Sequence, residues 1–170
     1  MKADRISWWV LVLLQTGFLI FVAQSAPHLP ERVASHFNAA GVANGWMLPS
    51  TYLRFIAAFG VVFPLLWAVG LPRLLRGTPV SLWNLPHRDY WLAPERWNET
   101  QAYLAVQFRW FGCLAVAFAA GVHASVVQAN LATPPHLGGP AIGAVTGLFL
   151  AAGIAWTIVL WRHFDRRPPA

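Results

Sequence analysis

The sequence predicts an all-α integral membrane protein, a bundle of four transmembrane helices with a short ordered outer loop and a cytoplasmic juxtamembrane helix. Two observations predict this class. The chain is 57% hydrophobic and only 11% charged, whereas soluble domains carry about 25% charged residues. Residues 110–161 contain no Lys, Arg, Asp or Glu, and this stretch is long enough to cross a hydrocarbon core of about 30 Å twice.

Four apolar segments define the predicted spans, at about residues 6–26, 52–71, 110–131 and 141–161. The last two are joined by a turn rich in Pro and Gly, which break helices. The first segment exceeds the apolar region of about 7–15 residues in a signal peptide, so we expect an uncleaved helix rather than a signal peptide. No internal repeat divides the chain, and residues 1–170 are interpreted as a single membrane domain.

The basic residues predict the orientation. Four crossings place both termini on one side, where ten Lys and Arg residues fall: Lys2, Arg5, Arg73, Arg76, Arg88, Arg96, Arg109, Arg162, Arg166 and Arg167. Arg32 and Arg54 lie on the other side. The positive-inside rule then predicts a multi-pass protein of the inner (cytoplasmic) membrane, with cytoplasmic N- and C-termini. Arg109 is expected to extend towards the inner lipid headgroups. The positive charges form no single stripe, which argues against a nucleic-acid partner.

Two polar loops remain, an outer loop at 27–51 and an inner loop at 72–109. In the outer loop, residues 33–38 are expected to be extended, and Gly41 and the Asn44-Gly45 pair are typical of turns. Trp46 is expected to reach the outer interface. In the inner loop, Pro94 suits the first position of a helix. Residues 94–108 therefore predict an amphipathic helix at the inner surface that leads into the third span.

The outer loop carries a pattern of Pro, then His-aromatic-Asn, then Gly, and then a small turn that ends in Trp. The matching residues are Pro30, His36, Phe37, Asn38, Gly41, Asn44 and Trp46. This pattern resembles the bacterial membrane-protein family known as domain of unknown function 1648. The inner-loop run at 85–96 is similar to a second segment of some members. The chain departs from the family pattern at Ala34, often Pro, and at Ala43-Asn44, often Pro-Asp.

The resemblance implies a role like that of SdpI-type immunity proteins, which protect a bacterium from a secreted toxin and can hold a transcription factor at the membrane. Their additional C-terminal membrane region has no clear counterpart here. We therefore predict a non-catalytic binding, immunity or signalling protein. The seven outer-loop residues would meet an extracytoplasmic peptide, and Arg88, Asp89, Tyr90 and Trp91 would meet a cytoplasmic protein. The lipid bilayer is a further expected partner. The GxxxG spacing of Gly143 and Gly147 also allows a homo-oligomer.

Catalytic motifs and cofactor-binding motifs are absent from the sequence, so neither an enzyme nor a cofactor is predicted. The alternative function is a small transporter or channel component with a polar path near His123, because an ionisable residue inside a span marks a functional candidate. Such a residue also packs helices together through hydrogen bonds. The side chains of His28, His36, His136 and Glu31 are of the types that bind Zn²⁺. Their spacing matches no zinc motif, and no metal site is predicted.

Overall fold

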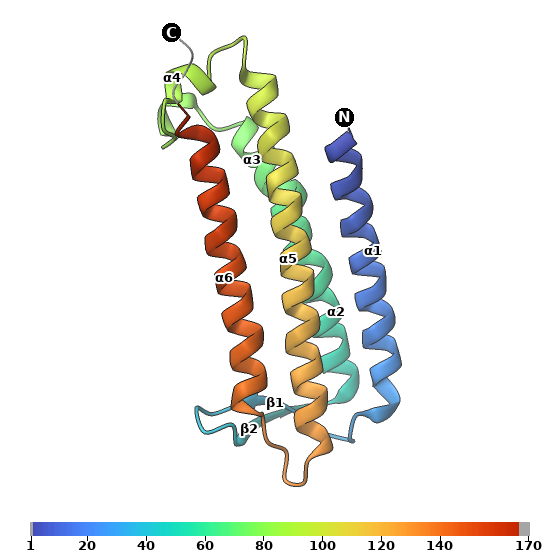
Figure 1. Cartoon of the computed structure of the whole chain (residues 1–170). Helices are drawn as coiled ribbons and strands as arrows, with labels where there is room; N and C mark the ends of the chain where they lie inside the picture. Colours follow the sequence, from blue (N-terminus) through green and yellow to red (C-terminus); the bar gives the residue numbers. More distant parts are fainter. Residues whose placement is uncertain (1, 167–170) are drawn as a thin grey trace.

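The computed structural model describes residues 2–166 and shows four long helices that run antiparallel, with a small β-hairpin at one end of the bundle (Figure 1). The long helices are α1 (Lys2–Ser25), α2 (Pro49–Leu65), α5 (Trp97–Leu131) and α6 (Gly139–Phe164). The hairpin consists of β1 (Val33–Phe37) and β2 (Ala43–Met47). The start of α1 and the end of α6 lie at the opposite end, which we call the terminal end; the other is the hairpin end.

The four helices confirm the predicted class, because each is long and apolar enough to cross a membrane. They indicate a multi-pass membrane protein. Short elements connect them: a 3₁₀ turn η1 (Ala26–His28), a π-helical turn η2 (Leu66–Gly70), α3 (Leu71–Arg76), a 3₁₀ turn η3 (Val80–Leu82) and α4 (Arg88–Trp91). The hairpin is a minor β element within the described residues.

The second span continues from α2 through η2 into α3, over residues 49–76. Proline has no N–H group and its ring crowds the carbonyl four residues earlier. Both Pro64 and Pro72 lie in this span, before and after the π-helical turn. In that turn Leu71 N donates to Leu66 O, five residues earlier. The wider turn therefore lets the span continue past its prolines, as π-turns commonly do.

The juxtamembrane helix differs from the prediction. Pro94 and Glu95 lie in a turn, and the helix begins at Trp97 instead of Pro94. Thr100 Oγ1 donates to Trp91 O at 2.7 Å, which ties the first turn of α5 to α4. From Trp97 the helix continues without interruption to Leu131, over 35 residues. At 1.5 Å per residue it is about 52 Å long, so the expected surface helix is the extension of α5 along the bundle.

The core consists of two clusters at different heights. The cluster at the hairpin end joins α1, α2, α5 and β1, through Leu11, Phe18, Val22, Val33, Tyr52, Ile56 and Val116. The second cluster lies at the terminal end and joins α5, α6 and the 77–96 loop, through Trp83, Leu92, Leu104, Phe108 and Phe164. Gly112 allows α5 to approach α2 closely, because a Cβ there would lie 3.0 Å from Pro64 O. The helices α1, α2 and α5 thus form the packed body, and α6 packs mainly against α5.

The sequence predicts that Arg109 extends towards the lipid headgroups, and the structure contradicts this prediction. Arg109 is 4% exposed and lies between α5 and α1. Its Nε donates to Ser7 Oγ at 2.9 Å and its Nη2 pairs with the carboxylate of Asp4. The guanidinium also lies 5.0 Å from the centre of the Trp8 ring. A charge inside a span is stabilised by partners, and α1 supplies all of these.

Candidate functional site

The loop between the first two long helices is a hairpin whose turn is closed by Asn38. Asn38 Oδ1 accepts hydrogen bonds from the backbone N–H groups of Ala40 and Val42, both at 3.0 Å. Asn38 N also donates to Val42 O, at 3.0 Å, and its carbonyl accepts from Gly41 N, at 2.9 Å. Asn commonly closes turns in this way. Asn38 therefore holds the shape of the hairpin.

The hairpin is anchored at its base by Asn130, near the end of α5. Asn130 Oδ1 accepts from Ala34 N at 2.8 Å, and its Nδ2 donates to Ala34 O at 2.9 Å. Nδ2 also donates to Val126 O within α5. The amide thus bonds both backbone groups of a β1 residue, as a neighbouring strand would. Ala34 is 0% exposed and Asn130 is buried, so these backbone groups depend on Asn130.

A second anchor comes from the loop between α5 and α6. Leu137 N donates to Gly41 O at 2.9 Å, and His136 Nε2 donates to Ala40 O at 3.1 Å. His136 also forms an antiparallel bridge with Val42. The hairpin is therefore held at its base by α5 and at its turn by the 132–138 loop. Holding a loop in one conformation lowers the entropic cost of binding.

Gly41 is required where the turn meets the 132–138 loop. Its φ of 77° lies in the left-handed region, which glycine adopts readily. A Cβ at this position would overlap the carbonyl oxygen of Leu137 and lie 2.9 Å from His136 Cε1. Both the backbone conformation and the close approach exclude a side chain here.

We expect Gly41→Ala to loosen the turn, because it adds the cost of a left-handed non-glycine residue, about 1–2 kcal/mol, to the overlap with Leu137. Hydrogen exchange of residues 38–43 measures this effect. The matched control is Gly138→Ala in the neighbouring loop, where an added Cβ meets no atom within 4 Å. Exchange that is equally slow in both variants would contradict this role.

The two faces of the hairpin differ in chemistry. Val33 belongs to the core cluster at the hairpin end, and Phe37 and Met47 pack against it. The side chains of His36, Asn44 and Trp46 are exposed instead, and Trp46 keeps 47% of its surface accessible. His36 pairs with Gly45 across the strands, and the absence of a side chain at Gly45 leaves room for the imidazole ring. Polar and aromatic side chains of the hairpin are thus both exposed.

The seven outer residues predicted from the sequence fall into three groups. His36, Asn44 and Trp46 are exposed residues of the strands. Asn38 and Gly41 lie in the turn, Phe37 packs against the core and Pro30 precedes the strands. The first group can contact a ligand directly. The others shape the surface that this group occupies.

The inner-loop residues lie in α4 at the terminal end. Arg88 and Asp89 form an exposed ion pair at 3.3 Å. Tyr90 is half-buried, with the guanidinium of Arg96 4.1 Å from its ring centre. Trp91 Nε1 donates to Phe164 O at 2.8 Å, so Trp91 attaches α4 to the end of α6. Arg88 and Asp89 remain accessible to a partner, whereas Trp91 serves the fold.

His123 links three helices in the core. Its Nε2 lies 2.8 Å from Ser25 Oγ at the end of α1, and its Nδ1 lies 2.9 Å from Tyr52 Oη in α2. Ser25 Oγ donates its one proton to Val22 O at 2.8 Å. The Nε2–H group of His123 must therefore donate to Ser25, and the Tyr52 hydroxyl donates to Nδ1. The ring is 0% exposed and both nitrogens have partners, so the geometry favours helix packing.

Two of the candidate zinc-binding side chains, those of His28 and His136, form other contacts. His28 Nδ1 lies 3.2 Å from Gln24 O, and His136 bonds to Ala40 O. Within residues 2–166, no group of three or more His, Cys, Asp or Glu side chains could hold a metal ion. The histidines His28 and His136 therefore stabilise the backbone around the hairpin.

The segment that forms most of α1, the hairpin and α2 carries the match to a known protein family. Residues 10–66 match the family model of DUF1648, a domain of unknown function. The match confirms the family resemblance of the outer loop. No curated protein and no solved structure matches the chain significantly. His123 and Asn130 lie outside the DUF1648 segment, and both bind it from α5.

Sequence reasoning did not select Asn130 or the contacts of His123 as parts of the hairpin site. Asn130 is a buried polar residue in the last turn of α5. That position was a signal for a capping or anchoring role. The partner of Asn130 is Ala34, which has no polar side chain. The sequence could not indicate this contact, because only the backbone of Ala34 forms the hydrogen bonds.

Proposed function

We propose that this chain is a non-catalytic protein of the bacterial inner membrane, an SdpI-like immunity or signalling protein that binds an extracytoplasmic peptide on its hairpin. The basic residues at the terminal end support cytoplasmic termini by the positive-inside rule. The hairpin then faces the outside of the cell. The DUF1648 match supports the relation to SdpI-type proteins through the segment that contains the hairpin.

The observation that carries this proposal is the exposed face of the anchored hairpin. Trp46 is 47% exposed, and its neighbours Val42 and Leu48 are 51% and 62% exposed. His36 and Asn44 add exposed hydrogen-bonding groups to the same hairpin. Tryptophan is enriched among the residues that dominate binding energies. A rigid surface with an aromatic centre and polar neighbours suits a peptide that has apolar side chains.

A signalling role requires a second surface at the terminal end, and α4 supplies it in this proposal. Arg88 and Asp89 are exposed there. The helix α5 extends from the hairpin anchor, Asn130, to the turn that holds α4, through Thr100. A peptide that favours one position of α5 would thus bias the surface offered to a cytoplasmic protein.

The test replaces Trp46 with a photo-crosslinking amino acid in cells of the source bacterium. We expect crosslinks to a secreted peptide. Leu148, which is 72% exposed on α6, serves as the matched crosslinking position. Crosslinks from position 46 to lipid alone would contradict the proposal and would assign Trp46 to interface anchoring.

The captured peptide is then synthesised, and its affinity for the purified protein is measured. We expect Trp46→Ala to weaken binding at least 30-fold, which corresponds to the loss of about 2 kcal/mol typical of a central aromatic residue. His36→Ala should weaken it less. Leu131→Ala is the control, because Leu131 is 66% exposed at the same end of the bundle. Equal affinity of the wild type and both hairpin variants would refute the site.

A further inference from the structure

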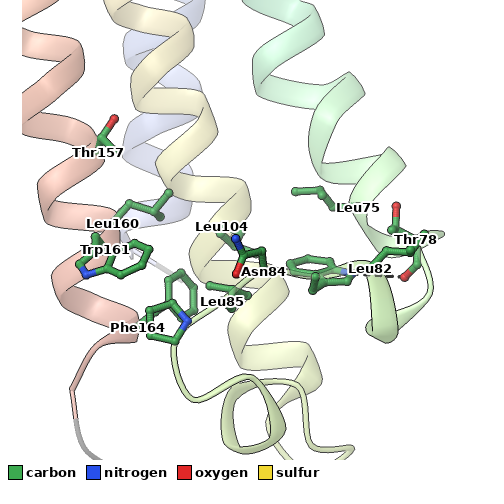
Figure 2. Close-up of a pocket in the computed structure, with 12 residues that line it drawn as sticks. Leu75, Thr78, Leu82, Asn84, Leu85, Leu104, Thr157, Leu160, Trp161 and Phe164 are labelled. Atoms are coloured by element: carbon green, nitrogen blue, oxygen red, sulfur yellow. Dashed lines mark hydrogen bonds between the residues drawn. The ribbon is translucent and has the colours of Figure 1, made fainter.

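A pocket of about 300 Å³ lies at the terminal end, between the last turns of α6 and those of α3 (Figure 2). Ligand pockets in proteins begin at about this size and are mostly apolar. Leucines from three helices and from the 77–96 loop form much of the wall: Leu75, Leu82, Leu85, Leu104 and Leu160. The cavity therefore has the size and the lining of a ligand site.

The lining of this pocket carries no charge. Its residues all lie within the described chain, at 2–166, and none of them is Lys, Arg, His, Asp or Glu. An unpaired charge is costly to bury among uncharged groups. The pocket therefore favours an uncharged occupant and disfavours the phosphate and ammonium groups of ordinary membrane lipids.

The polar groups of the lining leave one side chain free to bind a ligand. Thr78 Oγ1 donates to Leu74 O and Thr157 Oγ1 donates to Gly153 O, so both hydroxyl protons are used within the backbone. Asn84 is exposed, and Figure 2 shows its amide between the two walls. An amide can both donate and accept hydrogen bonds. One such group in an apolar pocket suits a molecule with a single hydroxyl or carbonyl head.

Tryptophan rings indicate how deep the pocket lies in the membrane. The rings of Trp67 and Trp156 lie near that of Phe108 on α5, with centres 6.1 and 5.7 Å away. The Trp8 ring lies 5.0 Å from the guanidinium of the next α5 residue, Arg109. These three tryptophans thus meet α5 at one level. Tryptophan is enriched where the hydrocarbon meets the headgroups, so this level marks that boundary.

The pocket lies about one helical turn beyond this boundary, towards the terminal end. Leu104 comes four residues before Phe108 on α5, and Leu160 comes four residues after Trp156 on α6. Four helical residues rise about 6 Å, and the headgroup layer extends about 5–8 Å beyond the hydrocarbon. The pocket therefore lies within the headgroup layer, at the depth where the head of a membrane amphiphile resides.

We propose that this pocket binds the head of an uncharged amphiphile of the bilayer. The hydroxyl or carbonyl oxygen of the head bonds to the amide of Asn84, and the adjoining carbons pack against Leu104 and Leu160. The site is separate from the hairpin and does not depend on the proposed peptide binding. Because α3, α5, α6 and the 77–96 loop all line the pocket, the bound molecule would connect the end of α6 to the rest of the bundle.

Isothermal titration calorimetry of the purified protein in detergent micelles tests this proposal, with the heat of titration into protein-free micelles subtracted. The probes are dodecanol, dodecanesulfonate and dodecyltrimethylammonium, which share their alkyl chain. We expect the neutral alcohol to bind at least about tenfold more tightly than either ion, because no lining residue compensates a charge. Asn84→Leu should weaken dodecanol binding about fivefold, the loss typical of one hydrogen bond. Asn98→Leu, at an exposed position of α5 outside the lining, should leave it unchanged.

Variants of Thr157 test the pocket itself, because Thr157 is an exposed residue of the lining. Thr157→Trp fills the pocket and should reduce dodecanol binding, whereas Thr157→Lys adds a positive charge and should shift the preference to dodecanesulfonate. The same two substitutions at Thr146, which is exposed on α6 outside the lining, are the controls and should change neither. Equal affinities of the wild type for the three probes would overturn the proposal. So would dodecanol binding that Thr157→Trp leaves unchanged.

Discussion

Replacing His123 with alanine is expected to lower the free energy of unfolding by about 3 kcal/mol, because it leaves a cavity and removes the partners of buried hydroxyl groups. The ring is 0% exposed and contacts the aromatic rings of Phe18, Phe21 and Tyr52. The alanine variant loses both of its hydrogen bonds, to Ser25 and Tyr52. Equilibrium unfolding of the purified protein in mixed detergent micelles measures the change.

A matched variant separates packing from hydrogen bonding. Tyr52→Phe keeps the aromatic ring and removes one hydrogen bond, so we expect a loss of about 0.6–1.7 kcal/mol, as for other hydrogen bonds between membrane helices. When His123→Ala and Tyr52→Phe are combined, their two losses of unfolding free energy should not add, because His123 and Tyr52 are in contact. Unchanged stability of His123→Ala together with loss of solute flux would contradict the packing role. That result would favour the transporter alternative.

Replacing Asn130 with alanine is expected to release β1 from α5 while the four helices stay folded. The substitution removes both hydrogen bonds to Ala34 and leaves two buried backbone groups without their partner. Each such group costs about 1–3 kcal/mol, so local opening of the hairpin should become easier by about 3 kcal/mol. Hydrogen exchange of residues 33–37 should then accelerate about 100-fold, since exchange reports local opening.

The control for Asn130→Ala is Gln128→Ala, two residues earlier on α5, where the side chain is exposed. We expect normal exchange in this variant. Asn130→Ala should also weaken peptide binding, although Asn130 lies outside the exposed face, because the hairpin would lose its fixed conformation. Unchanged exchange at Ala34 would show that Asn130 does not anchor the hairpin.

The hydropathy of the sequence was enough to predict the four helices, because a span must present about 20 apolar residues to lipid whatever its neighbours are. The extended segment and the turn at Gly41 were also predictable, whereas the Asn44-Gly45 pair, expected to form a turn, lies within β2. Gly41 and Asn38 have local conformational preferences that act over only a few residues. The start of α5 was predicted incorrectly at Pro94. The tie between Thr100 and the Trp91 carbonyl holds the preceding residues in a turn, and local propensity does not report such a contact.

For the candidate site, the sequence supplied the residue types but not their roles. His36, Asn44 and Trp46 are all exposed in the folded hairpin, His36 opposite Gly45 and Trp46 opposite Ala34, whereas Phe37, their neighbour in the motif, turns into the core. His136 was considered as a metal ligand and instead bonds a backbone carbonyl. Whether these residues bind a peptide stays a prediction.

By itself the sequence determined that this chain has four helices long and apolar enough to cross a membrane, with a loop that contains a turn between the first two. Lipid solvation and short-range backbone preferences depend on the residues themselves. Only the tertiary structure decided that Asn130 completes the hairpin, that His123 joins three helices and that Asp4 and Ser7 hold Arg109 inside the bundle. Each of these contacts joins residues 71 to 105 positions apart, so its energy depends on how the helices pack.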